Sequence, residues 1–160
     1  MERPSLLDYS TENCSIRRTL AVVGEKWTLE VLREVFNGVR RFEDMQAHTR
    51  VPRQVLSARL SSLVDQEILR RQPYREPGRR TRFEYRLTDK GRDLFPVLVA
   101  LLGWGDRWMP DADGPSIVLE HRDCGAGVQV GLTCAAGHPV GSAREVTARP
   151  GPGARLIESA

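Results

Sequence analysis

The sequence predicts a mainly α fold with a small β-hairpin, an α+β domain, followed by a small β-rich C-terminal appendage. Between residues 15 and 109, apolar residues recur at steps of three and four, which is the period of amphipathic helices. Two short runs, 68–73 and 82–87, flank a loop that contains Pro and Gly, and they predict the hairpin. After Pro115 the chain becomes rich in Gly with short β-like runs, so we place a domain boundary at 110–115.

Length and composition are those of one globular domain with an appendage. The 160 residues are 40% hydrophobic and 28% charged, which excludes fibrous, disordered and transmembrane proteins. We expect an N-terminal arm over 1–13, a main domain over 14–110, a β-rich extension over 116–150 and a flexible tail over 151–160. The first ten residues hold no signal-type segment, and three cysteines are too few for a disulfide scaffold. We therefore expect a cytoplasmic protein that makes no contact with membranes.

The first three helices are expected over residues 15–23, 26–36 and 41–48, each with apolar side chains on one side. Ser15 is a suitable N-cap for the first helix. Asn37 and the glycine after it close the second. Each of these short helices therefore has a face to bury against the others.

The fourth helix, over 52–66, begins with a proline, which is favoured in the first turn of a helix. Its Leu and Val residues lie on one face. The opposite face is small or polar and holds no acid: Arg53, Gln54, Ser57, Ala58 and Ser61. A helix face that is merely solvated usually mixes both signs of charge. This face is therefore a candidate binding surface.

The hairpin after the fourth helix is strongly basic. Seven arginines lie between Arg70 and Arg86, against Glu76 and Glu84. The last helix is expected over 89–109, and it holds more apolar residues than one face of a small domain can bury. Such a surplus predicts contact with a partner surface.

This order of elements is that of a winged helix-turn-helix. A short helix, a tight turn and an exposed helix form the helix-turn-helix, and the hairpin is the wing. A DNA major groove of about 12 Å admits one such helix. Residues 14–107 have a net charge of +7, whereas the two flanks have −4, and the basic part would attract phosphate. We expect the following residues to contact double-stranded DNA: Arg41, Arg53, Gln54, Ser57, Arg59, Arg75, Arg79, Arg80 and Arg82.

Several motifs in this order resemble the HxlR family of bacterial transcription regulators. They span residues 9–109 and lie at 14–20 (CSIRRTL), 24–29 (GEKWTL), 41–45 (RFEDM), 55–60 (VLSARL), 84–91 (EYRLTDKG) and 104–105 (WG). The resemblance implies a winged-helix homodimer with a MarR-like shape, built by the first and last helices of the domain. It further implies recognition of a palindromic operator through 52–66 and the wing at 72–83. We expect a repressor.

The effector is left open between a small molecule, an oxidant and none. Cys14 lies at the start of the first helix near Arg17 and Arg18, and both the helix end and the arginines lower the pKa of a thiol. In some HxlR relatives a cysteine at this position senses electrophiles or oxidants, so Cys14 is a candidate redox sensor. The alternative is a packing role.

The tail holds the spacing His121-x2-Cys124-x9-Cys134-x3-His138 on an expected hairpin of 116–120 and 128–132. Zinc sites use four N or S ligands that converge from short turns, so this set is a candidate zinc site. It has no spare ligand. The alternative is a metal-free β appendage with the cysteines reduced or joined to each other.

An enzyme is the competing class. The chain has no glycine-rich phosphate loop, no nucleophile elbow and no pair of carboxylates placed for acid–base work. We therefore expect no catalytic residue. A third class is a winged helix used only for protein contacts, which would lack a steep salt dependence of DNA binding.

Overall fold

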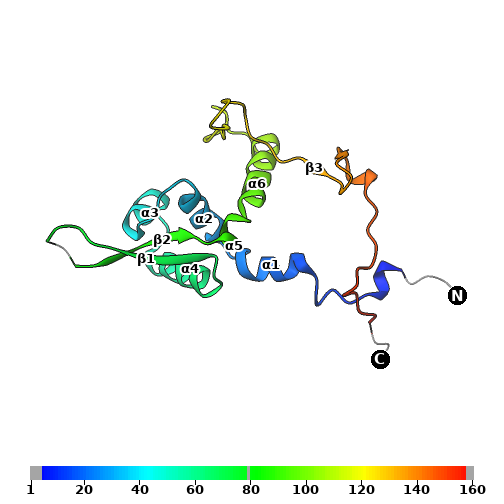
Figure 1. Cartoon of the computed structure of the whole chain (residues 1–160), viewed down its shortest axis with the longest axis horizontal. Helices are drawn as coiled ribbons and strands as arrows, with labels where there is room; N and C mark the ends of the chain where they lie inside the picture. Colours follow the sequence, from blue (N-terminus) through cyan, green and yellow to red (C-terminus); the bar gives the residue numbers. More distant parts are fainter. Residues whose placement is uncertain (1–4, 79, 158–160) are drawn as a thin grey trace. The chain divides into compact units, whose positions relative to one another are not determined.

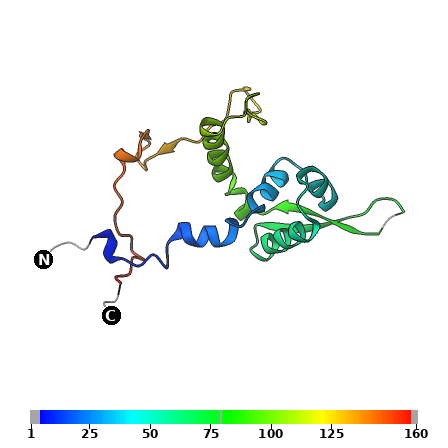
Figure 2. The same ribbon diagram turned by 180° about the vertical axis from the view of Figure 1, so that it is seen from behind.

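The computed structural model describes residues 5–78 and 80–157. They form two compact units, Glu25–Val130 and the pair of segments Met1–Gly24 and Gly131–Ala160. Figures 1 and 2 show the chain from opposite sides, and each unit is described by itself. These limits differ from those of the predicted domains, which stay a prediction.

The larger unit is mainly α with one antiparallel hairpin, which confirms the predicted fold class. Helices α2 (Thr28–Phe36), α3 (Phe42–Thr49) and α4 (Arg53–Asp65) pack together beside the hairpin (Figure 1). Their apolar faces form the core, whose largest fully buried apolar side chains are Leu32, Met45, Leu56, Leu60, Leu63, Ile68 and Leu69.

The turn between α3 and α4 is short and held by side chains. Arg50 ends α3 in the left-handed conformation, with φ of 56°. The Thr49 hydroxyl donates to the Met45 carbonyl at 2.7 Å and accepts from the Val51 N–H. Pro52 is the N-cap of α4, so this helix begins one residue later than predicted. Together α3, the turn and α4 form the helix-turn-helix.

The wing consists of β1 (Leu69–Tyr74) and β2 (Arg82–Leu87), paired in register from Leu69 with Leu87 to Tyr74 with Arg82. A further bridge joins Arg41 to Glu84, and the Tyr85 N–H donates to the Arg40 carbonyl at 2.8 Å. The segment that leads into α3 is therefore hydrogen-bonded to the wing. This places the N-terminus of α3 between the wing and α4.

The predicted helix over 89–109 is wrong in one respect, because it is broken into α5 (Asp89–Arg92) and α6 (Phe95–Trp108). Pro96 lies in the first turn of α6 and has no N–H, so it cannot donate to the carbonyl four residues earlier. Gly91 fixes α5 against the wing. A Cβ there would lie 2.2 Å from the Ile68 carbonyl oxygen.

The ends of two other predicted helices also differ. Helix α2 begins at Thr28, not at residue 26, because Trp27 takes a left-handed conformation with φ of 75° as its N-cap. Helix α1 (Ser15–Val23) has Cys14, not Ser15, as its N-cap. The apolar face of α1, expected to be buried, is instead largely exposed: Ile16 and Leu20 are 71% and 56% exposed, and only Val23 is buried.

The smaller unit contains η1 (Leu6–Asp8), α1, β3 (Leu132–Thr133), β4 (Pro139–Val140) and η2 (Ala143–Glu145). The Ser10 N–H donates to the Arg155 carbonyl at 2.8 Å, and the Ile157 N–H donates to the Asp8 carbonyl at 2.8 Å. Residues 155–157, expected in a flexible tail, are thus paired with the N-terminal arm.

The predicted tail hairpin is only partly formed. In the larger unit Glu120 bridges Gly127, and the Val128 N–H donates to the Leu119 carbonyl. The ladder between named strands in the tail is instead that of β3 and β4, where Leu132 pairs with Val140.

Candidate nucleic-acid interface

The outer face of α4 is exposed where the sequence predicts base contacts. Arg53, Gln54 and Ser57 are exposed in the first turns of the helix, while Leu56 and Leu60 on the inner face are fully buried. The first turn of α4 contains no acid. The free N–H groups of this helix end, together with Arg53, make the N-terminus of α4 attractive to anions and base acceptors.

Arg53 is bound to Glu43, a contact that sequence reasoning missed. Its Nη1 and Nη2 each donate to a Glu43 carboxylate oxygen at 2.9 Å. The guanidinium also lies over the Phe42 ring, 4.7 Å from its centroid. The hydrogen bonds and charge of Arg53 lower the pKa of Glu43, and those of Glu43 raise the pKa of Arg53. A surface hollow beside this pair is lined by Phe42, Glu43, Arg53, Gln54 and Ser57.

Arg41 is held in a similar way near the loop end of the wing strands. Its Nη1 donates to Glu76 at 2.9 Å, and its guanidinium lies 4.3 Å from the centroid of the Tyr74 ring. A second hollow lies here, lined by Arg41, Phe42, Glu43, Asp44, Tyr74, Glu76, Arg82, Phe83 and Tyr85. The two hollows share Phe42 and Glu43, so α4 and the wing border one continuous surface.

The remaining predicted DNA contacts fall into two groups. Arg75, Arg80 and Arg82 are exposed on the wing, and Arg79 lies outside the described residues. Arg59 differs, because its side chain is only 21% exposed and forms an ion pair with Glu25. It follows Ser57 by two residues, which is a turn of about 200° around the helix. Arg59 therefore lies away from the exposed face, and its ion pair joins α4 to the segment before α2.

A hydrogen bond between His48 and the buried carboxylate of Glu34 joins α3 to α2. The Glu34 side chain is fully buried, with Oε2 2.5 Å from His48 Nδ1 and Oε1 2.8 Å from Arg33 Nη2. Burial raises the pKa of Glu34, but the hydrogen bonds from His48 and Arg33 outweigh it, so the pKa lies below its ordinary value. The pair fixes α3, which holds Phe42 and Glu43 at the interface.

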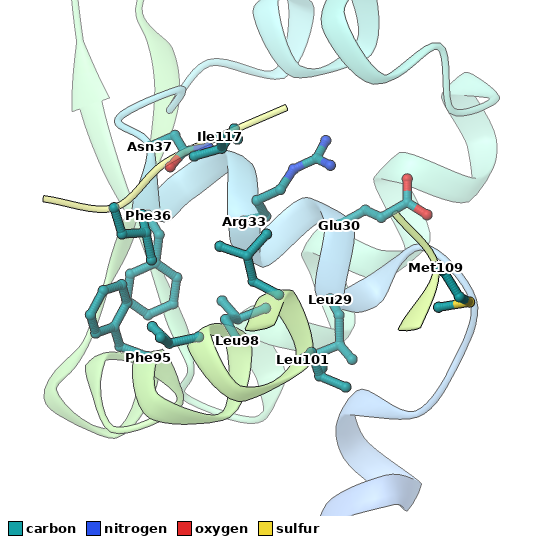
Figure 3. Close-up of a pocket in the computed structure, with 13 residues that line it drawn as sticks. Leu29, Glu30, Arg33, Phe36, Asn37, Phe95, Leu98, Leu101, Met109 and Ile117 are labelled. Carbon is teal, nitrogen blue, oxygen red and sulfur yellow. The ribbon is translucent and has the colours of Figure 1, made fainter. Parts of the chain in front are cut away.

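The larger unit also has an apolar groove between α2 and α6 (Figure 3). Phe36 and Phe95 lie side by side at one end, with ring centroids 5.3 Å apart. Leu98 and Leu101 of α6 form its wall. Large side chains of α6 and its C-cap remain exposed: Leu101 and Met109 in the lining of the groove, and Trp104 and Trp108 on the same helix. An apolar patch of this kind is typical of a protein contact.

Cys14 is half-buried at the N-cap of α1. The backbone N–H groups of Arg17 and Ile16 lower the pKa of its thiol, and the charges of Arg18 and Arg17 add to this effect. Stabilised thiolates are the reactive form of cysteine. The surroundings of Cys14 therefore favour the thiolate form of its side chain.

The four predicted metal ligands form two pairs, one in each unit. His121 Nδ1 lies 3.4 Å from Cys124 Sγ, and His138 Nδ1 lies 3.6 Å from Cys134 Sγ. With Zn–S of about 2.3 Å and Zn–N of about 2.0 Å, the two ligand atoms of a tetrahedral zinc ion are about 3.6 Å apart, so each pair has a suitable span. Across residues 5–78 and 80–157, no three His, Cys, Asp or Glu side chains gather into a group that could hold a metal ion. The zinc site stays a prediction.

Proteins similar to this chain are named as regulators of transcription. The profile of the HxlR-like helix-turn-helix family matches residues 22–113. The HTH-type transcriptional regulator Rv3095 of Mycobacterium tuberculosis is 44% identical over 155 residues, which are 96% of this chain and 97% of that protein.

Two solved structures extend the likeness to the fold. The crystal structure of PA1607, named as a candidate transcription factor, has a TM-score of 0.76 and 34% identity over 86% of this chain and 95% of that one. The reduced form of the redox regulator HypR has a TM-score of 0.51 and 26% identity over 57% of this chain and 90% of that one. Among the described residues, none of the helices is long and apolar enough to cross a membrane. The chain belongs to the HxlR family of helix-turn-helix transcriptional regulators, and its winged helix-turn-helix is a DNA-binding domain.

Proposed function

We propose that the protein is a repressor that binds a palindromic operator as a homodimer. The observation that supports this most directly is the exposed, acid-free N-terminal face of α4, with Arg53, Gln54 and Ser57 in its first turns. In this geometry Arg53 contacts a guanine edge and Gln54 an adenine edge in the major groove. Ser57 can donate a hydrogen bond to either base edge or accept one from it.

The wing supplies the contacts that do not depend on sequence. Arg75, Arg80 and Arg82 are exposed along it, and the sequence adds Arg79, which lies outside the described residues. We assign these arginines to phosphates or to the minor groove, and Arg41 to a phosphate near the loop end of the wing strands. Such contacts release counterions, so the affinity should fall steeply with salt.

The homodimer is supported by exposed apolar side chains on two helices. Leu101 and Trp104 of α6 and Ile16 and Leu20 of α1 are each about half exposed or more. A second copy would bury them. A two-fold dimer presents two recognition helices about one DNA turn apart, which requires a palindromic operator.

Cys14 makes this repressor responsive to oxidants in our proposal. Its stabilised thiolate attacks hydrogen peroxide, releases hydroxide and becomes a sulfenic acid. The named redox regulator HypR shares the fold. Peroxide should therefore weaken DNA binding by the wild type and leave a Cys14→Ser variant unaffected. An equal response in both proteins would reject the role of Cys14.

Selection of bound sequences from a random DNA pool, at several salt concentrations, tests the proposed function. We expect an enriched inverted repeat and a steep loss of affinity as salt rises. Enrichment of an asymmetric site would overturn the palindromic dimer. Binding that is absent, or that does not change with salt, would favour a winged helix used only for protein contacts. A reporter gene placed behind the selected operator should fall in expression when the protein is present, and a rise would overturn the repressor assignment.

A further inference from the structure

The strongest unexplained contact at the interface is the one between Arg53 and Glu43. Arg53 is the first residue of α4 and Glu43 the second residue of α3, so the contact joins the N-terminal ends of the two helices across the turn. Their side chains are 63% and 57% exposed, so the pair lies on the surface proposed to meet DNA. An exposed carboxylate in that place repels phosphates, so its presence calls for a reason connected with binding.

The geometry leaves one edge of the guanidinium for a ligand. Glu43 takes one N–H from Nη1 and one from Nη2, both at 2.9 Å. A guanidinium has five N–H groups, so this contact does not use Nε–H or the second N–H of Nη2. These two groups point along one side of the planar fork, and that side matches the O6 and N7 acceptors of guanine.

Two contacts together fix the plane of this fork. Glu43 holds its end, and the Phe42 ring lies beneath it with 4.7 Å between the guanidinium carbon and the ring centroid. A long arginine otherwise loses considerable rotamer entropy when it binds. Holding the guanidinium in the free protein reduces that loss for a ligand that meets the available edge.

The Glu43 carboxylate weakens contacts between Arg53 and the phosphates of the DNA backbone. It offsets the charge of Arg53 at close range, so a phosphate gains less from this arginine than from one without an acid partner. A guanine edge is neutral and gains its hydrogen bonds with less interference. The pair should therefore favour base contacts over phosphate contacts.

We propose that Glu43 is a positioning residue that determines specificity: it orients Arg53 toward one guanine and reduces the affinity for DNA of other sequence. This inference rests on the proposed function, because it requires Arg53 to contact a base. Glu43 itself contacts no base in this arrangement. The neighbouring Asp44 has the same charge on the same helical turn, and the structure gives no contact between it and Arg53.

The test measures binding of the full-length protein to the selected operator, to the same operator with each base pair changed, and to random-sequence DNA. Glu43→Ala should lose about tenfold in preference at one base pair, and it should bind random DNA more tightly than the wild type. Asp44→Asn is the matched control, which removes one charge and should keep the preference. Thermal unfolding of each variant checks that the fold is retained.

A double-mutant cycle shows whether Glu43 acts through Arg53. Arg53→Ala and the double variant with Glu43→Ala should lose preference at the same base pair and to the same extent. Full preference in Glu43→Ala, or an equal loss in Asp44→Asn, would overturn the inference while the proposed function stands. Absence of any sequence preference in the wild type would overturn the proposed function, and the inference with it.

Discussion

His48 Nδ1 in α3 lies 2.5 Å from the Glu34 carboxylate in α2, and the Glu34 side chain has no exposed area. This pair joins the first helix of the helix-turn-helix to the helix before it. A buried carboxylate is costly unless its oxygens are hydrogen-bonded, and here Arg33 occupies the second oxygen. The position of α3, and with it that of Phe42 and Glu43, therefore depends on a hydrogen-bonded carboxylate beneath the interface.

The first prediction concerns Glu34 and acid. Its pKa in the folded protein lies below the ordinary value of 4.5, so its ionised form stabilises the fold above about that pH. This stabilisation is lost as the pH falls from 4.5 through the lower folded pKa. Glu34→Gln should cost about 1–2 kcal/mol at neutral pH and show a smaller fall in Tm under acid.

Thermal unfolding between pH 7 and pH 3 measures both effects. His48→Gln serves as the companion variant, because it removes the partner and keeps the carboxylate. The double variant should lose less stability than the sum of the two single variants. If the Tm of the wild type and that of Glu34→Gln fell equally with pH, the stabilising role of the ionised Glu34 would be contradicted.

The second prediction concerns Gly91. A Cβ at this position would lie 2.2 Å from the Ile68 carbonyl oxygen and 3.1 Å from Leu87 Cδ2, so the backbone of α5 or the wing must shift to accept it. Gly91→Ala should therefore destabilise the protein by about 1–3 kcal/mol in urea unfolding. Gly127→Ala is the control, since its Cβ meets no atom within 4 Å. Equal stability of the two variants would show that α5 can shift to accept the methyl group without a loss in the free energy of unfolding.

The sequence predicted those features that have a local signal. The spacing of Leu56, Leu60 and Leu63 was enough to assign the buried face of α4 and, by difference, its exposed face. Arginine-rich runs on both sides of a turn were enough for the wing. Pro96 was a local sign of the break after α5, although the apolar pattern alone favoured one helix.

The rest depends on contacts between residues distant in the chain. Glu34 lies between the apolar residues of α2, and nothing local shows that His48, fourteen residues away, meets it. The contact between Glu43 and Arg53 likewise crosses the turn, and it is fixed by how α3 packs on α4. The low exposure of Arg59 likewise has no local signal, because it depends on the ion pair with Glu25 in the segment before α2.

The third prediction concerns the wing. Arg82 is exposed at the start of β2, opposite Tyr74. If it neutralises a phosphate, Arg82→Ala weakens binding to all sequences and reduces the slope of log affinity against log salt by about one. Arg82→Lys keeps the charge and should keep the slope. Titrations of operator and random DNA at several salt concentrations measure this, and a change in base preference would instead place Arg82 at a base edge.

The fourth prediction concerns the dimer. Leu101 is 48% exposed on α6, although it lines the apolar groove between α2 and α6. In a homodimer built on α6, a glutamate at this position would bury a charge without a partner, at a cost that exceeds the gain from the surrounding apolar contacts. Leu101→Glu should therefore yield monomers in light scattering and lose binding to the palindromic operator. Phe83→Glu changes a similarly exposed apolar residue on the wing and should leave the dimer intact. If Leu101→Glu remains a dimer, α6 is not the centre of the dimer interface. The exposed apolar residues of α1 would then be the other candidate for that interface.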